Sequence, residues 1–182
     1  MSSFRRIDIA VVETEFLFAI VNPRDKLHEY YLAMLDAVAM NSIGKVLIAP
    51  TSFVELFLVH LSRGAVSQFR LVINALNNVI KRVNDVLKRY RYQLLAFLQQ
   101  VEDVITIGNV DVRDFIFAQS FRDRFPKESP WDLLVAGFYE RVRQDNSGKI
   151  VAIVSGDVVY RRLGCLHVSV KEFRRIGRVK LG

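Results

Sequence analysis

The stretch IDIAVVE, residues 7–13, decides the fold class of this chain. Five of its first six residues are apolar and four of those are β-branched, which is typical of a strand buried on both faces. Strands of this kind belong to parallel sheets that carry helices on either side. The run ends on an acid, Glu13, and the carboxyl ends of parallel strands form the edge at which such sheets bind ligands. The stretch therefore predicts an α/β fold and a place to look for function.

Short apolar runs of the same kind recur along the chain, separated by segments with helical periodicity. Alternating strands and helices predict a parallel sheet whose strands are joined by right-handed crossovers. We expect a three-layer α/β/α fold with a central parallel sheet of four to five strands, formed by one domain of residues 1–182. The further strand-like runs cover residues 45–50, 104–108, 149–155 and 165–170, and the helical segments cover 14–21, 26–40, 51–63, 110–125 and 130–143.

Two of the helical segments begin with residues that favour helix starts. Thr51 or Ser52 is expected to be the N-cap of the 51–63 helix, with Glu55 close to the capping-box position. Ser129 is expected to be the N-cap of the 130–143 helix, with Pro130 at its first position.

An extended helical segment covers about residues 65–102. It contains no glycine or proline up to Val101, and its apolar positions follow a heptad stripe. The stripe predicts either one helix of about 55 Å or a helical hairpin that breaks near Asn77 and Asn78. Its apolar face has to pack on the chain's own core or, alternatively, on a dimer partner or partner helix.

The totals exclude several classes of protein. With 182 residues, of which 51% are apolar and 25% charged, the composition is that of a globular domain. The single cysteine, Cys165, excludes an internal disulfide, and together with the absence of a recognisable signal peptide it predicts a cytoplasmic protein. No apolar run reaches the roughly 18 residues that a membrane helix needs, so we expect no membrane partner.

The net charge of +7 favours a polyanionic partner, and the positive charge is concentrated. Between residues 63 and 93, seven basic residues face one acid, Asp85, and five more bases lie between Lys171 and Gly182. These segments are either solvated surface or a surface that binds a polyanion. The candidate binding residues are Arg63, Arg70, Lys81, Arg82, Lys88, Arg89 and Arg91.

Four acids fall where strands end. Glu13 ends the first strand, Glu55 lies at the start of the helix after the second, Asp132 begins a late helix, and Asp157 follows the fourth strand. Because carboxyl ends of parallel strands share one edge, the four side chains are expected to meet there. Such a cluster repels itself unless cations are present, and carboxylate oxygens suit Mg²⁺ or Mn²⁺. Thr14 and Ser155 either orient these ligands or act as local caps.

In this order and context, the acids resemble the pattern of the PIN-domain nucleases. That pattern is an Asp and then Thr or Ser after the first strand, a Glu at a helix start, an Asp opening a late helix, and a final Ser/Thr-x-Asp. The resemblance covers nearly the whole chain. It is carried by VVETEFLFAIVNPRD, IAPTSFVELFLVHL, SPWDLLVAGFYE and IVSGDVVYRRLGCLHVSVKEF.

The resemblance implies a small metal-dependent endoribonuclease, in which the candidate binding residues between Arg63 and Arg91 would be RNA-binding residues. In such a protein Glu13, Glu55, Asp132 and Asp157 would be the catalytic and metal-binding residues, with Mg²⁺ or Mn²⁺ as cofactor. Toxin-like members of the family form homodimers and are neutralised by an antitoxin protein, so both partners are expected here. The sequence departs from the family at one point, because Glu13 stands where the family has Asp.

Each acid also has an ordinary structural alternative. Glu13 would then be an ordinary solvated carboxylate at a strand end. Glu55 would be a capping-box acid, Asp132 a residue that favours a helix N-terminus, and Asp157 a turn residue. Glu15 either contributes to the site or faces away from it, whereas Asp8 lies at the wrong end of its strand. Because of the Glu13 departure, a catalytically impaired PIN-like domain that binds RNA or protein is the alternative function.

Overall fold

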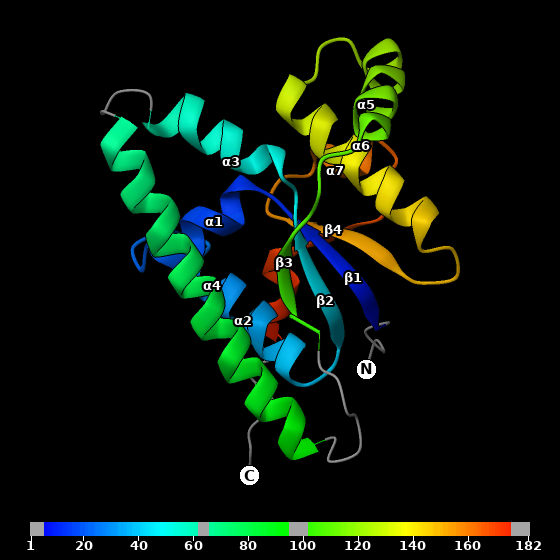
Figure 1. The fold of residues 1–182 in the computed structure, drawn as a ribbon. Helices are drawn as coiled ribbons and strands as arrows, with labels where there is room; N and C mark the ends of the chain where they lie inside the picture. The colour runs from blue at the N-terminus through cyan, green and yellow to red at the C-terminus, as the bar shows by residue number, and fades with distance from the viewer. Residues whose placement is uncertain (1–5, 62–65, 95–101, 176–182) are drawn as a thin grey trace.

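A five-stranded parallel sheet forms the centre of the computed structural model, which describes residues 6–61, 66–94 and 102–175 (Figure 1). The strand order is β3-β2-β1-β4-β5, and every neighbouring pair is parallel. The predicted α/β fold is confirmed. The strands are β1 (Ile7–Val12), β2 (Ile43–Ile48), β3 (Ile105–Ile107), β4 (Val151–Ser155) and β5 (His167–Ser169).

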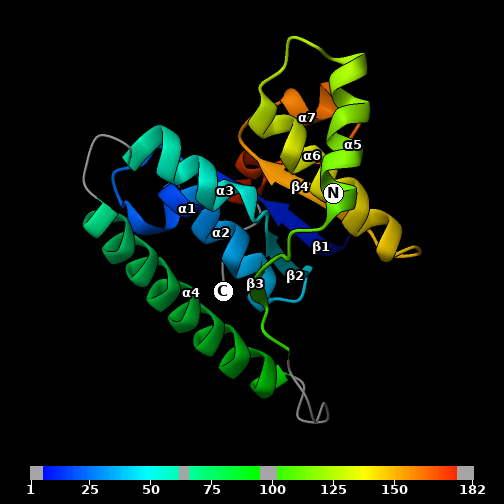
Figure 2. The ribbon, with the colours of Figure 1, turned by 45° about the horizontal axis from the view of Figure 1, so that its top comes forward.

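Helices cover both faces of the sheet, as the buried strands require (Figure 2). Successive residues of β1 point to opposite faces, so Ala10 and Val12 join one apolar cluster while Ile9 and Val11 join the other. The first cluster contains residues of α1 (Thr14–Val21), α2 (His28–Ala39), α4 (Val66–Leu94) and a 3-10 helix (Val170–Arg175). The second contains residues of α5 (Val112–Arg124), α6 (Pro130–Asp145) and α7 (Val159–Arg162).

The helix after β2 differs from the prediction in two ways. α3 (Thr51–Glu55) continues as a π-helix over Leu56–Leu61 instead of one regular helix over 51–63. Its N-cap is Pro50, which already has helical angles, and no side chain caps the helix start. The expected caps, Thr51 or Ser52 with Glu55 in a capping box, are therefore wrong. By contrast, Ser129 is the N-cap of α6, where its hydroxyl accepts a hydrogen bond from the Trp131 amide at 3.2 Å.

α4 is one continuous helix through Asn77 and Asn78, which excludes the hairpin alternative for residues 66–94. Its 29 residues correspond to a length of about 44 Å. Leu76, Ile80 and Leu87 of the heptad stripe are buried in the apolar cluster that they share with α2 and the sheet. These three positions of the stripe thus pack on the chain's own core, whereas Tyr90 of the stripe is exposed. Positions 95–101 of the predicted segment lie outside the described residues.

A side chain of α4 completes the hydrogen bonding of the edge strand β3. The buried Asn84 amide donates to the Ile105 carbonyl at 2.9 Å, and its oxygen accepts from the Ile105 N–H at 2.7 Å. Asn84 thus takes the place that a neighbouring strand would occupy.

We expect Asn84→Ala to lower the free energy of unfolding by about 1–3 kcal/mol, because it leaves two buried backbone groups unpaired. Urea denaturation measures this effect. Asn78→Ala, an exposed position of the same helix, is the matched control and is expected to change little. Equal stability of the two variants would contradict the role of Asn84.

Close packing of α5 on α6 fixes the helix that carries Asp132. A Cβ on Gly137 would lie 2.1 Å from the Asp114 carbonyl oxygen, so only glycine permits this approach. Arg141 then donates to the buried Asp114 carboxylate at 2.5 Å. No helix in the described part of the chain is long and apolar enough to cross a membrane.

Candidate active site

The strand order makes the carboxyl ends of β1 and β4 a topological switch point. The chain runs from β1 outward through β2 to β3, then returns to place β4 on the other side of β1. At such a switch point, the segments that leave the two central strands diverge to opposite faces, and a crevice opens at their carboxyl ends. Here α1 follows β1 and α7 follows β4. We call the surface formed there, with the start of α6 and with α3, the carboxyl edge.

Glu13 lies in the centre of the carboxyl edge. It is the residue between β1 and α1, only 8% of it is exposed, and its Oε1 accepts a hydrogen bond from the Ser155 hydroxyl at 2.6 Å. Burial raises the pKa of Glu13 to about 8, although the Ser155 hydrogen bond opposes this shift. The charges of Glu15, Asp132 and Glu55 raise the pKa further.

Glu55 faces the start of α1. Its Oε2 accepts a hydrogen bond of 2.5 Å from the hydroxyl of Thr14, which also lies 3.3 Å from the Ser52 carbonyl oxygen. Glu55 is the last residue before the π-helix, and single π-helical turns are frequent at functional sites. Its carboxylate is thus directed across the sheet edge and not back to its own helix start.

Asp132 occupies the first turn of α6 and is half-buried. Its Oδ1 lies 3.4 Å from the hydroxyl of Tyr160, a fully buried residue of α7. Burial raises the pKa of Asp132 to about 6, and the charges of Asp157 and Glu55 contribute to the increase. A favourable helix N-terminus alone would lower this pKa, so burial and the neighbouring acids dominate.

Asp157 is a turn residue, as its structural alternative predicted, and its charge also acts on the neighbouring acid Asp132. Its Oδ1 accepts a hydrogen bond from the Val159 amide at 2.9 Å at the start of α7. Its own amide donates to the Ser155 hydroxyl at 3.0 Å. The carboxylate is exposed and close enough to raise the pKa of Asp132.

Glu15, which the sequence left open, and two tyrosines that were not identified as site residues also lie at the carboxyl edge. Glu15 does not face away, because its Oε1 accepts hydrogen bonds from the Gly156 amide at 2.7 Å and from the Tyr31 hydroxyl at 2.8 Å. Tyr160 and Tyr31 are both fully buried, and burial raises the pKa of each well above its ordinary value. Nothing in the spacing of Tyr31 along α2 distinguishes it from a core residue.

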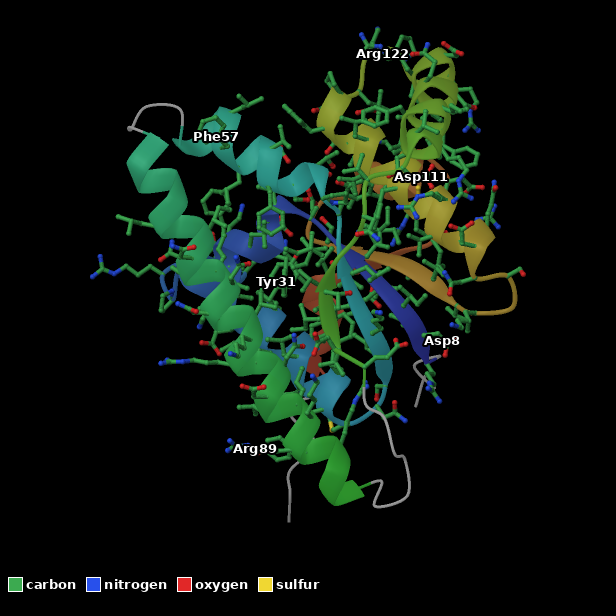
Figure 3. The ribbon with its side chains drawn as sticks, in the orientation of Figure 1. Asp8, Tyr31, Phe57, Arg89, Asp111 and Arg122 are labelled. Atoms are coloured by element: carbon green, nitrogen blue, oxygen red, sulfur yellow. The ribbon has the colours of Figure 1, made fainter. Side chains whose placement is uncertain are left out.

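Several predicted RNA-binding residues lie away from this edge. Arg91 donates to the carbonyl oxygens of Ile43 and Gly44 at 3.2 and 2.6 Å, at the amino end of β2. Lys88 is ion-paired with Asp103, which precedes β3. Asp8, at the amino end of β1, accepts a hydrogen bond from the Ile150 amide at 2.9 Å (Figure 3). Arg91 and Lys88 thus make contacts within the fold at the opposite edge of the sheet.

The remaining bases of the cluster fall into two groups. Lys81, Arg82 and Arg89 are exposed on α4, and Arg89 projects away from the body of the protein (Figure 3). Arg63 lies outside the described residues, as does the side chain of Arg70.

The acids of the carboxyl edge are chemically suited to a hard divalent cation. All four offer oxygen ligands, and the raised pKa values of Glu13 and Asp132 reflect burial and repulsion that a cation would relieve. In the described residues, no three or more His, Cys, Asp and Glu side chains are grouped as a metal site would require. Glu13, Glu55 and Asp157 instead accept hydrogen bonds from Ser155, Thr14 and the Val159 amide, and Asp132 faces Tyr160.

Comparisons with known proteins add no assignment. No protein-family model matches the sequence, and no curated protein matches it significantly. Any functional conclusion therefore rests on the residues of the carboxyl edge.

Proposed function

We propose that the protein is a metal-dependent endoribonuclease of the PIN-like type. The proposal is supported by the acids that follow strands or begin helices at the carboxyl edge, where burial and the charges of neighbouring acids raise the pKa of Glu13 to about 8 and of Asp132 to about 6. A protein gains no stability from buried carboxylates that lack cationic partners, whereas a binding site for cations requires them.

Glu13, Glu55, Asp132 and Asp157 would hold one or two Mg²⁺ or Mn²⁺ ions. When bound, such ions activate water and stabilise the charge that develops on a phosphodiester during hydrolysis. The hydroxyls of Ser155 and Thr14 donate hydrogen bonds to the carboxylates of Glu13 and Glu55 and so fix their orientation. Tyr160 is fully buried, and its hydroxyl lies 3.4 Å from Asp132 Oδ1.

Cleavage of a labelled single-stranded RNA by the purified chain tests this function. We expect cleavage in Mg²⁺ or Mn²⁺ and none in chelator. Duplex RNA and a flap DNA, assayed in parallel, distinguish a single-strand ribonuclease from a structure-specific DNA nuclease. Failure to cut any of the substrates in the presence of metal would remove the proposal.

We expect the exposed bases of α4, Lys81, Arg82 and Arg89, to bind the RNA backbone. Each substitution by Gln should weaken binding and reduce the slope of log affinity against log salt by about 0.7, the value for one phosphate contact on a single strand. Fluorescence anisotropy at several salt concentrations measures the slope. Arg122→Gln, on the remote α5, is the control (Figure 3). An unchanged slope in the α4 variants would show that these bases do not contact the RNA backbone.

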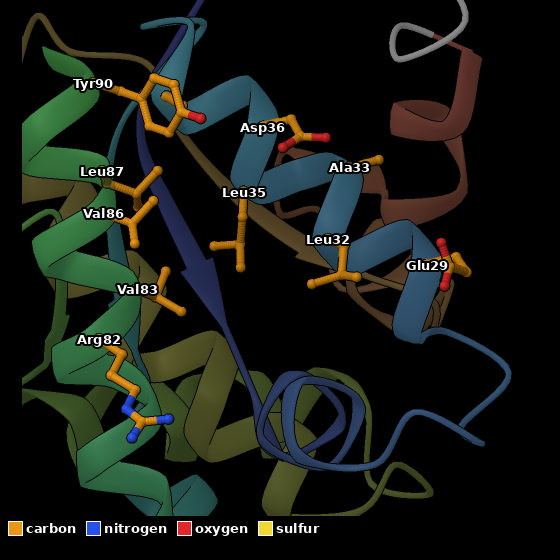
Figure 4. Close-up of a pocket in the computed structure, with 11 residues that line it drawn as sticks. Glu29, Leu32, Ala33, Leu35, Asp36, Arg82, Val83, Val86, Leu87 and Tyr90 are labelled. Carbon is orange, nitrogen blue, oxygen red and sulfur yellow. The ribbon is translucent and has the colours of Figure 1, made fainter. Parts of the chain in front are cut away.

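Protein partners are the second part of the proposal. A groove of about 640 Å³ lies along the contact between α2 and α4, where apolar side chains of both helices line it between Arg82 and Tyr90 (Figure 4). Grooves of this kind accept the apolar face of a helix, so the groove is our candidate surface for an antitoxin protein. We also propose that the chain is a homodimer. Light scattering at tens of micromolar tests this, and a strict monomer would contradict it.

One observation favours the alternative of a catalytically impaired PIN-like module that binds RNA or protein. The Glu13 side chain is one methylene longer than Asp, and it is already hydrogen-bonded to Ser155 at 2.6 Å. This alternative predicts RNA binding without cleavage and weak binding of Mn²⁺ in calorimetry. The ribonuclease proposal predicts both cleavage and Mn²⁺ binding that requires Asp132 and Asp157.

A further inference from the structure

We infer that Glu15 is a positioning residue that clamps the Ser155–Gly156–Asp157 turn to α1. The carboxylate of Glu15 accepts a hydrogen bond from the Gly156 amide at 2.7 Å. A side chain that follows β1 therefore holds the backbone that follows β4. The inference deepens the proposed function, and its consequence for metal binding rests on that function. The clamp itself is a feature of the fold and can be tested separately.

The Gly156 backbone lies directly against the Glu15 carboxylate. A Cβ at Gly156 would be 2.9 Å from both Glu15 carboxylate oxygens and 3.1 Å from Leu27 Cδ1. Any side chain at this position would displace the carboxylate. The turn and Glu15 thus form a matched pair, which explains why a glycine stands between Ser155 and Asp157.

Tyr31 fixes the orientation of Glu15. Its hydroxyl donates to the same Oε1 atom at 2.8 Å, and its fully buried ring packs edge-on against Phe16 with centroids 5.4 Å apart. Because the ring cannot move without disturbing the core, the carboxylate that it holds is also fixed. α2 in this way supports a contact between α1 and the turn.

The Glu15–Gly156 hydrogen bond lies beside the Glu13–Ser155 hydrogen bond, and both hold the end of β4 to the segment that follows β1. Glu13 binds the first residue of the turn and Glu15 the second, so two acids of one segment hold the end of β4 across the switch point. Asp157, the third residue, donates its amide to the Ser155 hydroxyl, so its position depends on the two residues before it. A displacement of about 1 Å at a reacting centre can cost on the order of 10²-fold in rate.

The test compares Glu15→Ala, Glu15→Gln and Tyr31→Phe with the wild type. The first readout is hydrogen exchange at the Gly156 amide, measured by NMR without metal. We expect protection to be lost in Glu15→Ala and retained in Glu15→Gln, whose amide oxygen still accepts the bond, with an intermediate value for Tyr31→Phe. Glu29→Ala, an exposed acid of α2, is the control. Equal protection in Glu15→Ala and wild type would overturn the clamp.

The second readout is the affinity for Mn²⁺ in calorimetry. Loss of a residue that supports metal ligands typically costs about 10–100-fold in affinity, and we expect this loss in Glu15→Ala with rescue in Glu15→Gln. An unchanged affinity in Glu15→Ala would show that the clamp does not serve the metal site. Should the wild type bind no Mn²⁺ and cut no RNA, the proposed function fails, and the exchange experiment alone decides the clamp.

Discussion

Asp132→Asn and Asp157→Asn are each expected to lower the rate of RNA cleavage by about 10²-fold or more. Loss of a group that merely supports metal ligands costs about 10–100-fold, so loss of a ligand charge costs at least as much. Both changes keep the shape of the side chain, and the amide oxygen in the Asp157→Asn variant can still accept the bond that Asp157 accepts from the Val159 amide. Single-turnover cleavage of a labelled RNA at saturating Mn²⁺ measures the loss.

Stability separates this expectation from simple misfolding. Removal of the Asp132 charge relieves the burial and repulsion that raise its pKa, so Asp132→Asn should melt at the same temperature as the wild type or higher in chelator. Asp123→Asn, an exposed acid of α5, is the matched control for activity. If both site variants kept wild-type cleavage rates, the carboxyl edge would not be the active site.

The second large effect is a loss of stability as pH rises in metal-free buffer. The pKa of Glu13 is raised from 4.5 to about 8, so between these values the folded protein holds a proton that the unfolded chain has released. Stability from this group is complete below pH 4.5, and it falls by up to about 1.4 kcal/mol per pH unit until pH 8. Asp132 acts with the same sign between 3.8 and about 6.

Glu13→Gln should remove most of this dependence. At pH 7 we expect the variant to exceed the wild type in free energy of unfolding by about 3 kcal/mol, as measured by urea denaturation in chelator. Adding Mn²⁺ should flatten the wild-type profile, because a cation favours the ionised carboxylates, and should have little effect on the variant. Glu29→Gln is the control. A wild-type stability that rises with pH from 5 to 8 would contradict the burial of Glu13.

The sequence was sufficient for the sheet and for the acids that end its strands. The runs at 7–12 and 149–155 are apolar enough to be buried strands, and the residues after them lie at one edge in any parallel sheet. The position of Glu13 and Asp157 at that edge therefore follows from the local sequence pattern and from the parallel topology.

The remaining features depend on tertiary contacts that leave no periodic signal. Glu15 lies two residues beyond Glu13, and only the placement of α2 and of the β4 turn brings Tyr31 and Gly156 to its carboxylate. Arg91 belongs by composition to a basic cluster, yet the length of α4 carries it to the amino end of β2. The capping prediction for Glu55 failed because Pro50 starts the helix early and Thr14 competes for the carboxylate.

The contact between Asn84 and Ile105 has a consequence for self-association. The edge strand of an open sheet has unpaired N–H and C=O groups to which a second chain can add a strand. Here an amide side chain already saturates the first residue of the outermost strand on the β3 side. Pairing of β3 with a strand of a second copy is therefore disfavoured. A dimer would instead form through helical surfaces on this side of the protein.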